Sequence, residues 1–415
     1  MQQENNNNSC FEWIQLFITI SIPVAIGVYT ILESKRDFAI ETHNRKQDLY
    51  IADDQQKDLI LHECQKTLSK LIEKYGTKLN KSSSASIVAR FTTLSALNRL
   101  DSNRRNFLVR LLYEAKLITY RSDDYQPPVS LQSANLTDLN LIDDDSEQRI
   151  LVHLSLEGTI MTRADFHEIN IRGARFRDAI LINADFSWTW NSPTFDDEMN
   201  TFKYNSSKLF FDNANLTSAS FFSATYDNVD FTRVIMIYAN LHMFFCVNCL
   251  FDSVTMTEVN LENAAIENSS FMFAKLDYAN LYRSKFGLNV DFYETIMNNV
   301  NGAYTNFTKC ALTKTKLMNS IFDYAVFIDS TFSYAYMHKV SMKYCRVING
   351  NFTGADLSHS DWRYAHCERC IFNQANLTNA NLFGATFIES DFRYSEIMEK
   401  QLLQTASLEW SMLSI

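Results

Sequence analysis

Residues 372–392 read F-N-Q-A-N-L-T-N-A-N-L-F-G-A-T-F-I-E-S-D-F, which places a large apolar residue at every fifth position. A small residue, Ala or Ser, stands two positions before each of the last four. A helix requires apolar residues about every 3.6 positions and a strand every second one, so neither alone fits a strict period of five. The period instead predicts a chain that turns a corner every five residues. The small and the large residue of each short side then both point inward.

The same period covers most of the chain. It runs from Leu151 to Leu402, with an interruption near residue 190 and a one-residue slip between Gly287 and Asp291. Outside these two irregularities, Gly302 is the one position of the period that is not apolar. We therefore predict a β-helix over residues 134–402 with an insertion at 187–210. Its predicted core contains these large residues: Phe166, Phe176, Phe186, Phe211, Phe221, Phe231, Phe271, Phe322, Phe327, Phe332, Phe352, Trp362, Phe372, Phe387 and Phe392.

Local runs such as Ala134-Asn135-Leu136-Thr137 and the A-N-L-T-N-A-N-L of residues 375–382 resemble the pentapeptide-repeat family. The resemblance extends over the whole periodic region and includes register as well as composition. It implies a mainly β fold, a right-handed, quadrilateral β-helix with the large residues stacked along its axis. Solenoids of this kind usually serve as recognition surfaces.

An apolar segment precedes the repeats. Residues 13–32 read W-I-Q-L-F-I-T-I-S-I-P-V-A-I-G-V-Y-T-I-L and contain no charged side chain, and a helix of this length spans a bilayer. After a polar tail at 1–12, we predict one transmembrane helix, whose residues include Trp13, Phe17, Pro23, Gly27 and Leu32. A cleaved signal peptide is the competing interpretation. The absence of Lys or Arg before the segment and its length both disfavour a signal peptide.

Basic residues near the ends of the segment predict its orientation. None precedes it, whereas Lys35, Arg36, Arg45 and Lys46 follow it closely. The positive-inside rule therefore predicts a single-pass membrane protein with the bulk of the chain in the cytoplasm.

Between the predicted anchor and the β-helix the sequence favours helices. Residues 33–80 are expected to form a charged stalk, whose short stripe at Leu61, Cys64 and Leu68 is expected to pack on the following helices rather than form a dimer. Residues 84–120 are expected to form an αα-hairpin, and the apolar face of its first helix is expected at Ile87, Val88, Phe91, Leu94 and Leu97. The stretch 90–118 resembles the segment ahead of the repeats in uncharacterised, membrane-anchored pentapeptide-repeat proteins. Its arginines also suggest an alternative interpretation, a DNA-binding helix-turn-helix, but the neighbouring membrane anchor disfavours it. Residues 121–133, with two prolines, form the expected linker.

Charge and cysteine spacing limit the possible functions. Positions 1–130 hold 17 Lys and Arg against 15 Asp and Glu, which leaves 21 against 33, a net charge of −12, for the rest. Cys246-x-x-Cys249 and Cys367-x-x-Cys370 resemble zinc half-sites, but in register both members of each pair point inward. The two pairs also lie too many coils apart to share one metal ion. We therefore predict buried free thiols, no metal or other cofactor, and no enzymatic activity.

The insertion at 187–210 is the strongest candidate for recognition, because loops on rigid scaffolds often carry binding sites and aromatic residues anchor interfaces. Its candidate partner-binding residues are Trp188, Trp190, Phe195, Phe202 and Tyr204; the alternative is a lid folded back onto the coil. Residues 403–415, including Trp410 and Met412, are expected to cap the open end or to contact a second copy. A homodimer formed through the stalk is a further alternative.

Together these observations predict a membrane-anchored, non-enzymatic scaffold that presents a rigid rod to an unidentified protein partner. The first alternative is an acidic rod that mimics DNA and inhibits a type II topoisomerase, as some pentapeptide-repeat proteins do; no nucleic-acid partner is expected. The second is a purely structural spacer.

Overall fold

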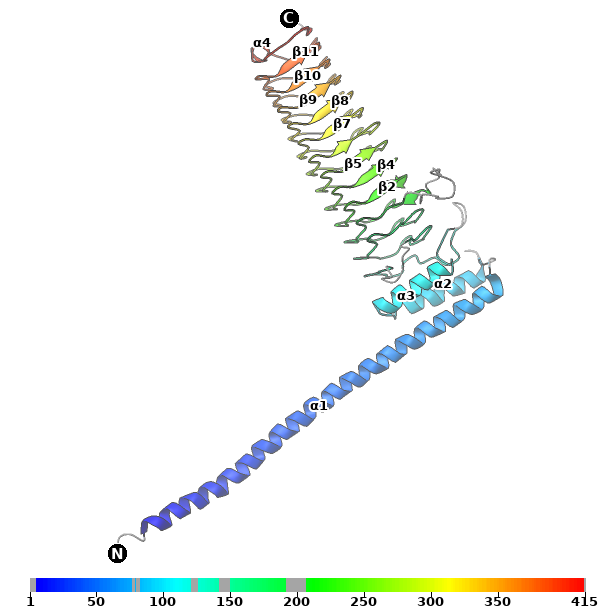
Figure 1. The fold of residues 1–415 in the computed structure, drawn as a ribbon, viewed down its shortest axis with the longest axis vertical. Coiled ribbons are helices and arrows are strands. Elements are labelled where there is room, and N and C mark those ends of the chain that lie inside the picture. Colours follow the sequence, from blue (N-terminus) through cyan, green and yellow to red (C-terminus); the bar gives the residue numbers. More distant parts are fainter. Residues whose placement is uncertain are drawn as a thin grey trace, which may run out of the picture. The chain divides into compact units, whose positions relative to one another are not determined.

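A computed structural model describes residues 5–76, 79, 83–120, 126–141, 150–191 and 207–413. The chain divides into two compact units, Met1–Glu63 and Cys64–Ile415. The first unit is helical, and the second contains the end of the same helix, three further helices and a long stack of β-coils (Figure 1).

Helix α1 spans Asn5–Tyr75 and supplies the whole described part of the first unit. Its apolar segment is not buried anywhere in the structure, and by length and composition it could span a membrane or act as a signal sequence. Trp13, Phe17 and Leu32 are 69%, 74% and 60% exposed. Pro23 lies inside the helix and nothing approaches Gly27.

Helices α2 (Ser84–Leu97) and α3 (Ser102–Glu114) form the hairpin at the start of the second unit. The Asp101 carboxylate caps α3 by accepting a hydrogen bond from the Arg104 amide, and the Ser83 hydroxyl caps α2 in the same way. Cys64 and Leu68, near the end of α1, are buried, as the predicted intrachain packing requires.

The predicted apolar face of α2 is wrong in the first half of the helix, whereas Leu97 near its end is buried with 1% exposure. Helix α2 buries Ala85, Ser86 and Ala89 instead, whereas Ile87 and Phe91 are 65% and 75% exposed. Small residues let the helix approach its neighbours closely, so the face with the smallest side chains is the one that packs.

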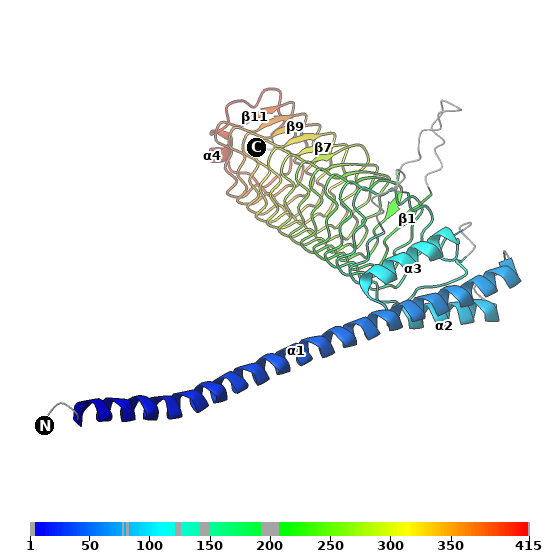
Figure 2. The ribbon, with the colours of Figure 1, turned by 60° about the horizontal axis from the view of Figure 1, so that its bottom comes forward.

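The hairpin arginines bind the first coils of the solenoid. The Arg90 guanidinium donates to the Gln132 carbonyl at 3.0 Å, and that of Arg105 to the Asn135 carbonyl at 3.1 Å. These bonds satisfy carbonyls at the open end of the stack, where no earlier coil is present. Helices α2 and α3 lie at this end of the solenoid (Figure 2).

In the described residues, nine short strands form one parallel sheet along the solenoid, and β1 pairs with β3 in a second, two-stranded sheet (Figure 1). In the regular part each strand pairs with the equivalent strand of the next coil, as in Val326↔Arg346 and Arg346↔His366. Single parallel bridges connect the coils on the remaining sides. These pairings recur at every fifth residue, four times in each full coil. The coil therefore has four sides. The strands are β1 (Leu209–Phe210), β2 (Thr225–Asp227), β3 (Val229–Asp230), β4 (Phe245–Val247), β5 (Ala265–Glu267), β6 (Lys285–Phe286), β7 (Asn306–Thr308), β8 (Val326–Ile328), β9 (Arg346–Ile348), β10 (His366–Glu368) and β11 (Thr386–Ile388).

Each corner is a tight turn with one residue in the left-handed region. After Phe211, for example, Asn213 has φ 60°, and the Ala214 amide donates to the Phe211 carbonyl at 2.8 Å. The polar residue before the large one stabilises the next corner: the Asn215 side chain accepts hydrogen bonds from the Thr217 amide and hydroxyl at 3.0 and 2.7 Å. This side-chain turn explains the recurring A-N-L-T sequence.

The predicted core residues are all buried, each with 1% exposure or less. Their rings stack in columns from coil to coil, as Phe332 and Phe352 do with centroids 4.8 Å apart. Burial of each such side chain contributes about 1.5–3 kcal/mol. At Gly302 a Cβ atom would lie 2.3 Å from the Phe322 ring, so this ring occupies the space that a large residue would need.

Two irregularities interrupt the repeat. Phe286 pairs with Phe307, one position later than the regular spacing would place its partner, so the slip adds a single residue. Trp190 bridges Thr225, where the regular spacing would place residue 210. The excess therefore follows Asn191, and the coil register is the same on both sides of it. The predicted bounds of the insertion, 187–210, are therefore wrong: residues 187–191 complete a regular side of the coil, and Leu209–Phe210 form strand β1.

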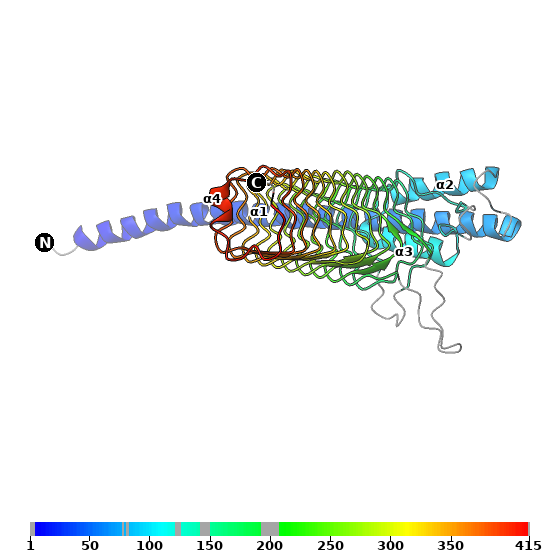
Figure 3. The same cartoon turned by 90° about the horizontal axis from the view of Figure 1, so that it is seen from above.

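Helix α4 (Glu399–Leu402) lies at the carboxyl-terminal end of the stack (Figure 3). The side-chain amide of Gln401 donates hydrogen bonds to the backbone carbonyls of Leu377 and Ala380, both at 2.8 Å. These bonds satisfy acceptors at the end of the stack. The predicted end of the β-helix at 402 is wrong, because residues 399–402 are helical and Ser407, within the predicted cap 403–415, still pairs with Thr386 of the previous coil. Trp410 is 80% exposed, although Met412 still bridges Asp391.

Candidate interaction surface

Two of the five predicted partner-binding residues lie on regular coil. Trp188 occupies a corner, with φ 58° and 49% exposure, and its ring packs edge-on against Phe222 at 5.6 Å. Trp190 is half-buried on the next side. Phe195, Phe202 and Tyr204 lie outside the described residues.

Asn191 closes the coil at the base of the insertion. It stands where the period requires an apolar residue and is fully buried. Its amide donates to the Asp227 carbonyl at 2.7 Å, and its oxygen accepts from the Asp227 amide at 2.8 Å. The side chain therefore replaces one missing backbone pairing. This explains why a polar residue is stable on the axis.

Four tyrosines form an exposed ladder along the same corner as Trp188. The centroids of Tyr304, Tyr324, Tyr344 and Tyr364 follow one another at 4.9, 4.9 and 5.1 Å, with rings within 12° of parallel. Each tyrosine occupies the left-handed corner position and is 46–48% exposed. A left-handed conformation costs a residue other than glycine about 1–2 kcal/mol. Stacking offsets part of this cost.

Further aromatic side chains extend the ladder in both directions. Tyr282 packs edge-on against Tyr304 at 5.6 Å, and Phe383 against Tyr364 at 5.7 Å. Nearer the insertion, Phe222 stacks on His242 at 5.6 Å. We call this set the aromatic edge; it consists of Trp188, Phe222, His242, Tyr282, Tyr304, Tyr324, Tyr344, Tyr364 and Phe383. The sequence signal for it is a tyrosine at 304, 324, 344 and 364, which an inspection limited to the inward residues misses.

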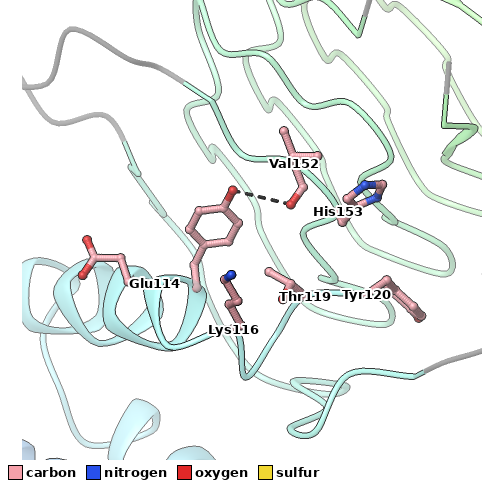
Figure 4. Close-up of a pocket in the computed structure, with 7 residues that line it drawn as sticks. Glu114, Lys116, Thr119, Tyr120, Val152 and His153 are labelled. Carbon is pink, nitrogen blue, oxygen red and sulfur yellow. Dashed lines mark hydrogen bonds between the residues drawn. The ribbon is translucent and has the colours of Figure 1, made fainter. Parts of the chain in front are cut away.

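A cleft lies where the hairpin meets the first coils, with a volume of about 630 Å³ (Figure 4). Its lining residues are Tyr113, Glu114, Lys116, Thr119, Tyr120, Val152 and His153. The Tyr113 hydroxyl donates toward the Val152 carbonyl at 3.4 Å, and burial raises its pKa. Because this contact joins the hairpin to the coil, we assign the cleft a structural role.

The predicted free thiols of the two Cys-x-x-Cys pairs are wrong. Cys246 and Cys249 form a disulfide, as do Cys367 and Cys370, with Cα–Cα distances of 6.2 and 5.9 Å. The reason is the register itself. A large inward residue and the small inward residue three positions later flank the same corner, within bonding reach.

Other cysteines remain free and buried: Cys64, Cys310 and Cys345. Burial raises the pKa of the Cys64 thiol to about 11 and that of Cys310 to about 12. These groups therefore stay protonated and unreactive at neutral pH. Within the described ranges, no three His, Cys, Asp or Glu side chains gather to hold a metal ion.

This geometry defines a four-sided, parallel β-solenoid, a class of repeat protein that offers long surfaces rather than a deep pocket. Residues 150–190 and 351–394 match the family model for pentapeptide repeats, with eight copies. These two segments are therefore pentapeptide repeats, as the five-residue period predicts, and proteins built of such repeats are typically structural or interaction proteins.

No curated protein sequence matches the chain. Among solved structures, it resembles HetL from the cyanobacterium Nostoc, a pentapeptide-repeat protein involved in the regulation of heterocyst differentiation, at 18% identity and a TM-score of 0.32; the match covers 58% of this chain and 91% of HetL. It also resembles QnrB1, a plasmid-mediated fluoroquinolone resistance protein, at 13% identity and a TM-score of 0.28, over 50% of this chain and 91% of QnrB1.

Proposed function

We propose that the protein is a membrane-anchored, non-enzymatic scaffold whose solenoid binds a protein partner through the aromatic edge. The observation that carries this proposal is the row of half-exposed aromatic side chains on a single corner. Aromatic side chains supply large contact areas at interfaces. The continuous backbone pairing beneath them holds their spacing fixed.

The anchor in this proposal is the apolar segment of α1. The basic residues that follow it support a solenoid on the cytoplasmic side. The two disulfides are more typical of oxidising compartments. Because all four cysteines are at most 1% exposed, however, reductants reach these sulfurs poorly.

Glycan analysis tests this orientation, since the coils carry acceptor triplets such as those at Asn215 and Asn376. Treatment with a peptide N-glycosidase should leave the electrophoretic mobility of the cell-derived protein unchanged. A shift would place the solenoid on the opposite side of the membrane.

The DNA-mimic alternative would need a continuous acidic stripe. Arginine and lysine interrupt the acidic residues instead: Arg177 pairs with Asp212 at 2.8 Å, and Lys314 with Glu294 at 3.1 Å. These pairs favour a protein-binding scaffold over an acidic rod that mimics duplex DNA.

Affinity purification of the full-length protein from mild detergent, followed by mass spectrometry, tests the proposal. The test variant is Trp188→Ala, and the matched control is Phe273→Ala. Phe273 is also 49% exposed at a corner and packs edge-on against a second ring, that of Tyr293 at 5.9 Å, but lies on another edge.

We expect a partner that the wild type and the control recover equally and that Trp188→Ala loses by about tenfold or more, as for an interface anchor. Circular dichroism of all three proteins controls for folding. Equal recovery with both variants, or no partner with any of them, would contradict the scaffold role and favour a spacer.

A further inference from the structure

The tyrosine ladder has a chemistry that the rest of the aromatic edge lacks. Its rings stack on one another, so each inner ring has a neighbour on both faces. What remains accessible is the ring rim with its phenolic hydroxyls. The rim of an aromatic ring is electropositive, and a phenolic hydroxyl donates hydrogen bonds.

The charges beside the ladder also differ from those of the solenoid. Residues 131–415 carry a net charge of −12. Next to the ladder, however, Lys343 and Arg363 offset the nearby Asp323 and Asp361, with ion-pair distances of 2.9 and 2.7 Å. Arg346 is exposed on the adjoining strand β9 and adds a further positive charge.

Two more basic side chains stand at the start of the ladder. Arg283 and Lys285 are exposed at the corner and on strand β6, directly before Tyr304 in the stack. The strip from Arg283 to Tyr364 therefore presents donors and net positive charge on an otherwise acidic solenoid.

We propose that the tyrosine ladder and its flanking basic residues bind an extended, acidic polypeptide segment that lies along the solenoid axis. Carboxylates complement both the electropositive ring rims and the guanidinium of Arg346. Single-stranded nucleic acid normally stacks its bases on aromatic faces, and the self-stacked rings leave no inner face for that contact.

This inference rests on the proposed scaffold function, because it names the chemistry of the partner at the same edge. The probe is a fluorescent dodecamer of glutamate, titrated against the full-length protein in detergent and followed by anisotropy. A serine–glycine dodecamer and a single-stranded oligothymidine serve as comparison ligands.

The first variant is Arg346→Glu, and its matched control is Lys339→Glu, an exposed basic residue on another corner. We expect Arg346→Glu to weaken glutamate binding about tenfold and the control to leave it unchanged. Affinity should also fall as salt rises, because the contacts are exposed.

The second variant changes Tyr304, Tyr324, Tyr344 and Tyr364 to Phe, which keeps the stack and removes the hydroxyls. Weaker glutamate binding with an unchanged melting temperature would support the inference. The inference would be overturned if the oligothymidine bound more tightly than the glutamate dodecamer. It would also be overturned if Arg346→Glu and the wild type bound the glutamate dodecamer with equal affinity. Should the purification above still identify an edge-dependent partner, the scaffold function would stand and only its acidic chemistry would be refuted.

Discussion

The Arg175 guanidinium lies 3.6 Å from the centre of the Tyr120 ring, and this contact fastens the end of the hairpin to the solenoid. Arg175 faces outward on its coil but is only 7% exposed, because Tyr120 on one side and Phe210 at 5.1 Å on the other cover it. The Thr119 backbone bridges Leu154 beside it. A cation over an aromatic face is stabilised by the ring quadrupole, more strongly when water is excluded.

Tyr120→Ala should therefore destabilise the amino-terminal coils by about 2–4 kcal/mol, from lost burial and the lost cation contact. Hydrogen exchange should show faster opening of residues 150–190 and little change beyond residue 300, because solenoid coils contact only their neighbours. The control is Lys275→Ala at an exposed outward position. Uniformly faster exchange along the whole stack would show that this contact does not act locally.

Gly302→Leu restores the apolar period and should nevertheless destabilise the protein. The new side chain would collide with the Phe322 ring, and overpacking of a core typically costs about 1–3 kcal/mol. The midpoint of urea unfolding should fall. The double variant Gly302→Leu, Phe322→Ala should recover part of the loss. A stabilised single variant would show that the Phe322 ring can move aside at no cost.

The free cysteines should resist alkylation in the folded protein. Because burial raises the pKa of Cys310 to about 12, almost no thiolate is present at pH 8, and iodoacetamide should label Cys310 and Cys345 only after unfolding. Mass spectrometry without reduction should also find Cys246 joined to Cys249 and Cys367 joined to Cys370. Four alkylated cysteines at these positions in unfolded, unreduced protein would refute the disulfides.

Acid should weaken the carboxyl-terminal coil. Hydrogen bonding from Arg393 is the largest influence on Asp391 and holds the pKa of this carboxyl below its usual value. A depressed pKa stabilises the fold above the unfolded pKa, near 4, and the contribution is lost as the pH falls through the folded value. Thermal melts between pH 5 and pH 2 should show a decline that is smaller in Asp391→Asn. An identical pH profile for the variant and the wild type would show that Asp391 does not contribute to the loss of stability in acid.

The five-residue period predicted the solenoid and its core because both depend on a local, repeated choice of inward residues. Phe166 to Phe392 follow from that rule alone. The same period places Cys246 and Cys249 on either side of one corner, but an interpretation of them as separate inward residues neglects this proximity and misses the disulfide. It also extended the insertion over Trp188, because Asn191 looks like a break until its hydrogen bonds to Asp227 are seen.

The outward surface was harder to predict. Outward positions accept almost any side chain, so each tyrosine of the ladder looks unremarkable by itself. Its meaning depends on the length of one full coil, which brings Tyr304 and Tyr324 face to face. The exposure of Ile87 and Phe91 was missed because small residues, rather than the large apolar ones, pack in the first half of α2; Leu97 near its end is buried as predicted.

Site-specific photo-crosslinking in cells tests most directly whether the aromatic edge binds the partner. Tyr324→p-benzoylphenylalanine places the probe within the ladder, and Tyr238→p-benzoylphenylalanine places it at an exposed corner of another edge, where Tyr238 is 57% exposed. The scaffold account predicts one discrete crosslinked protein from position 324 and none from position 238. Equal crosslinking from both positions, or none from position 324 in a folded, correctly localised protein, would contradict it.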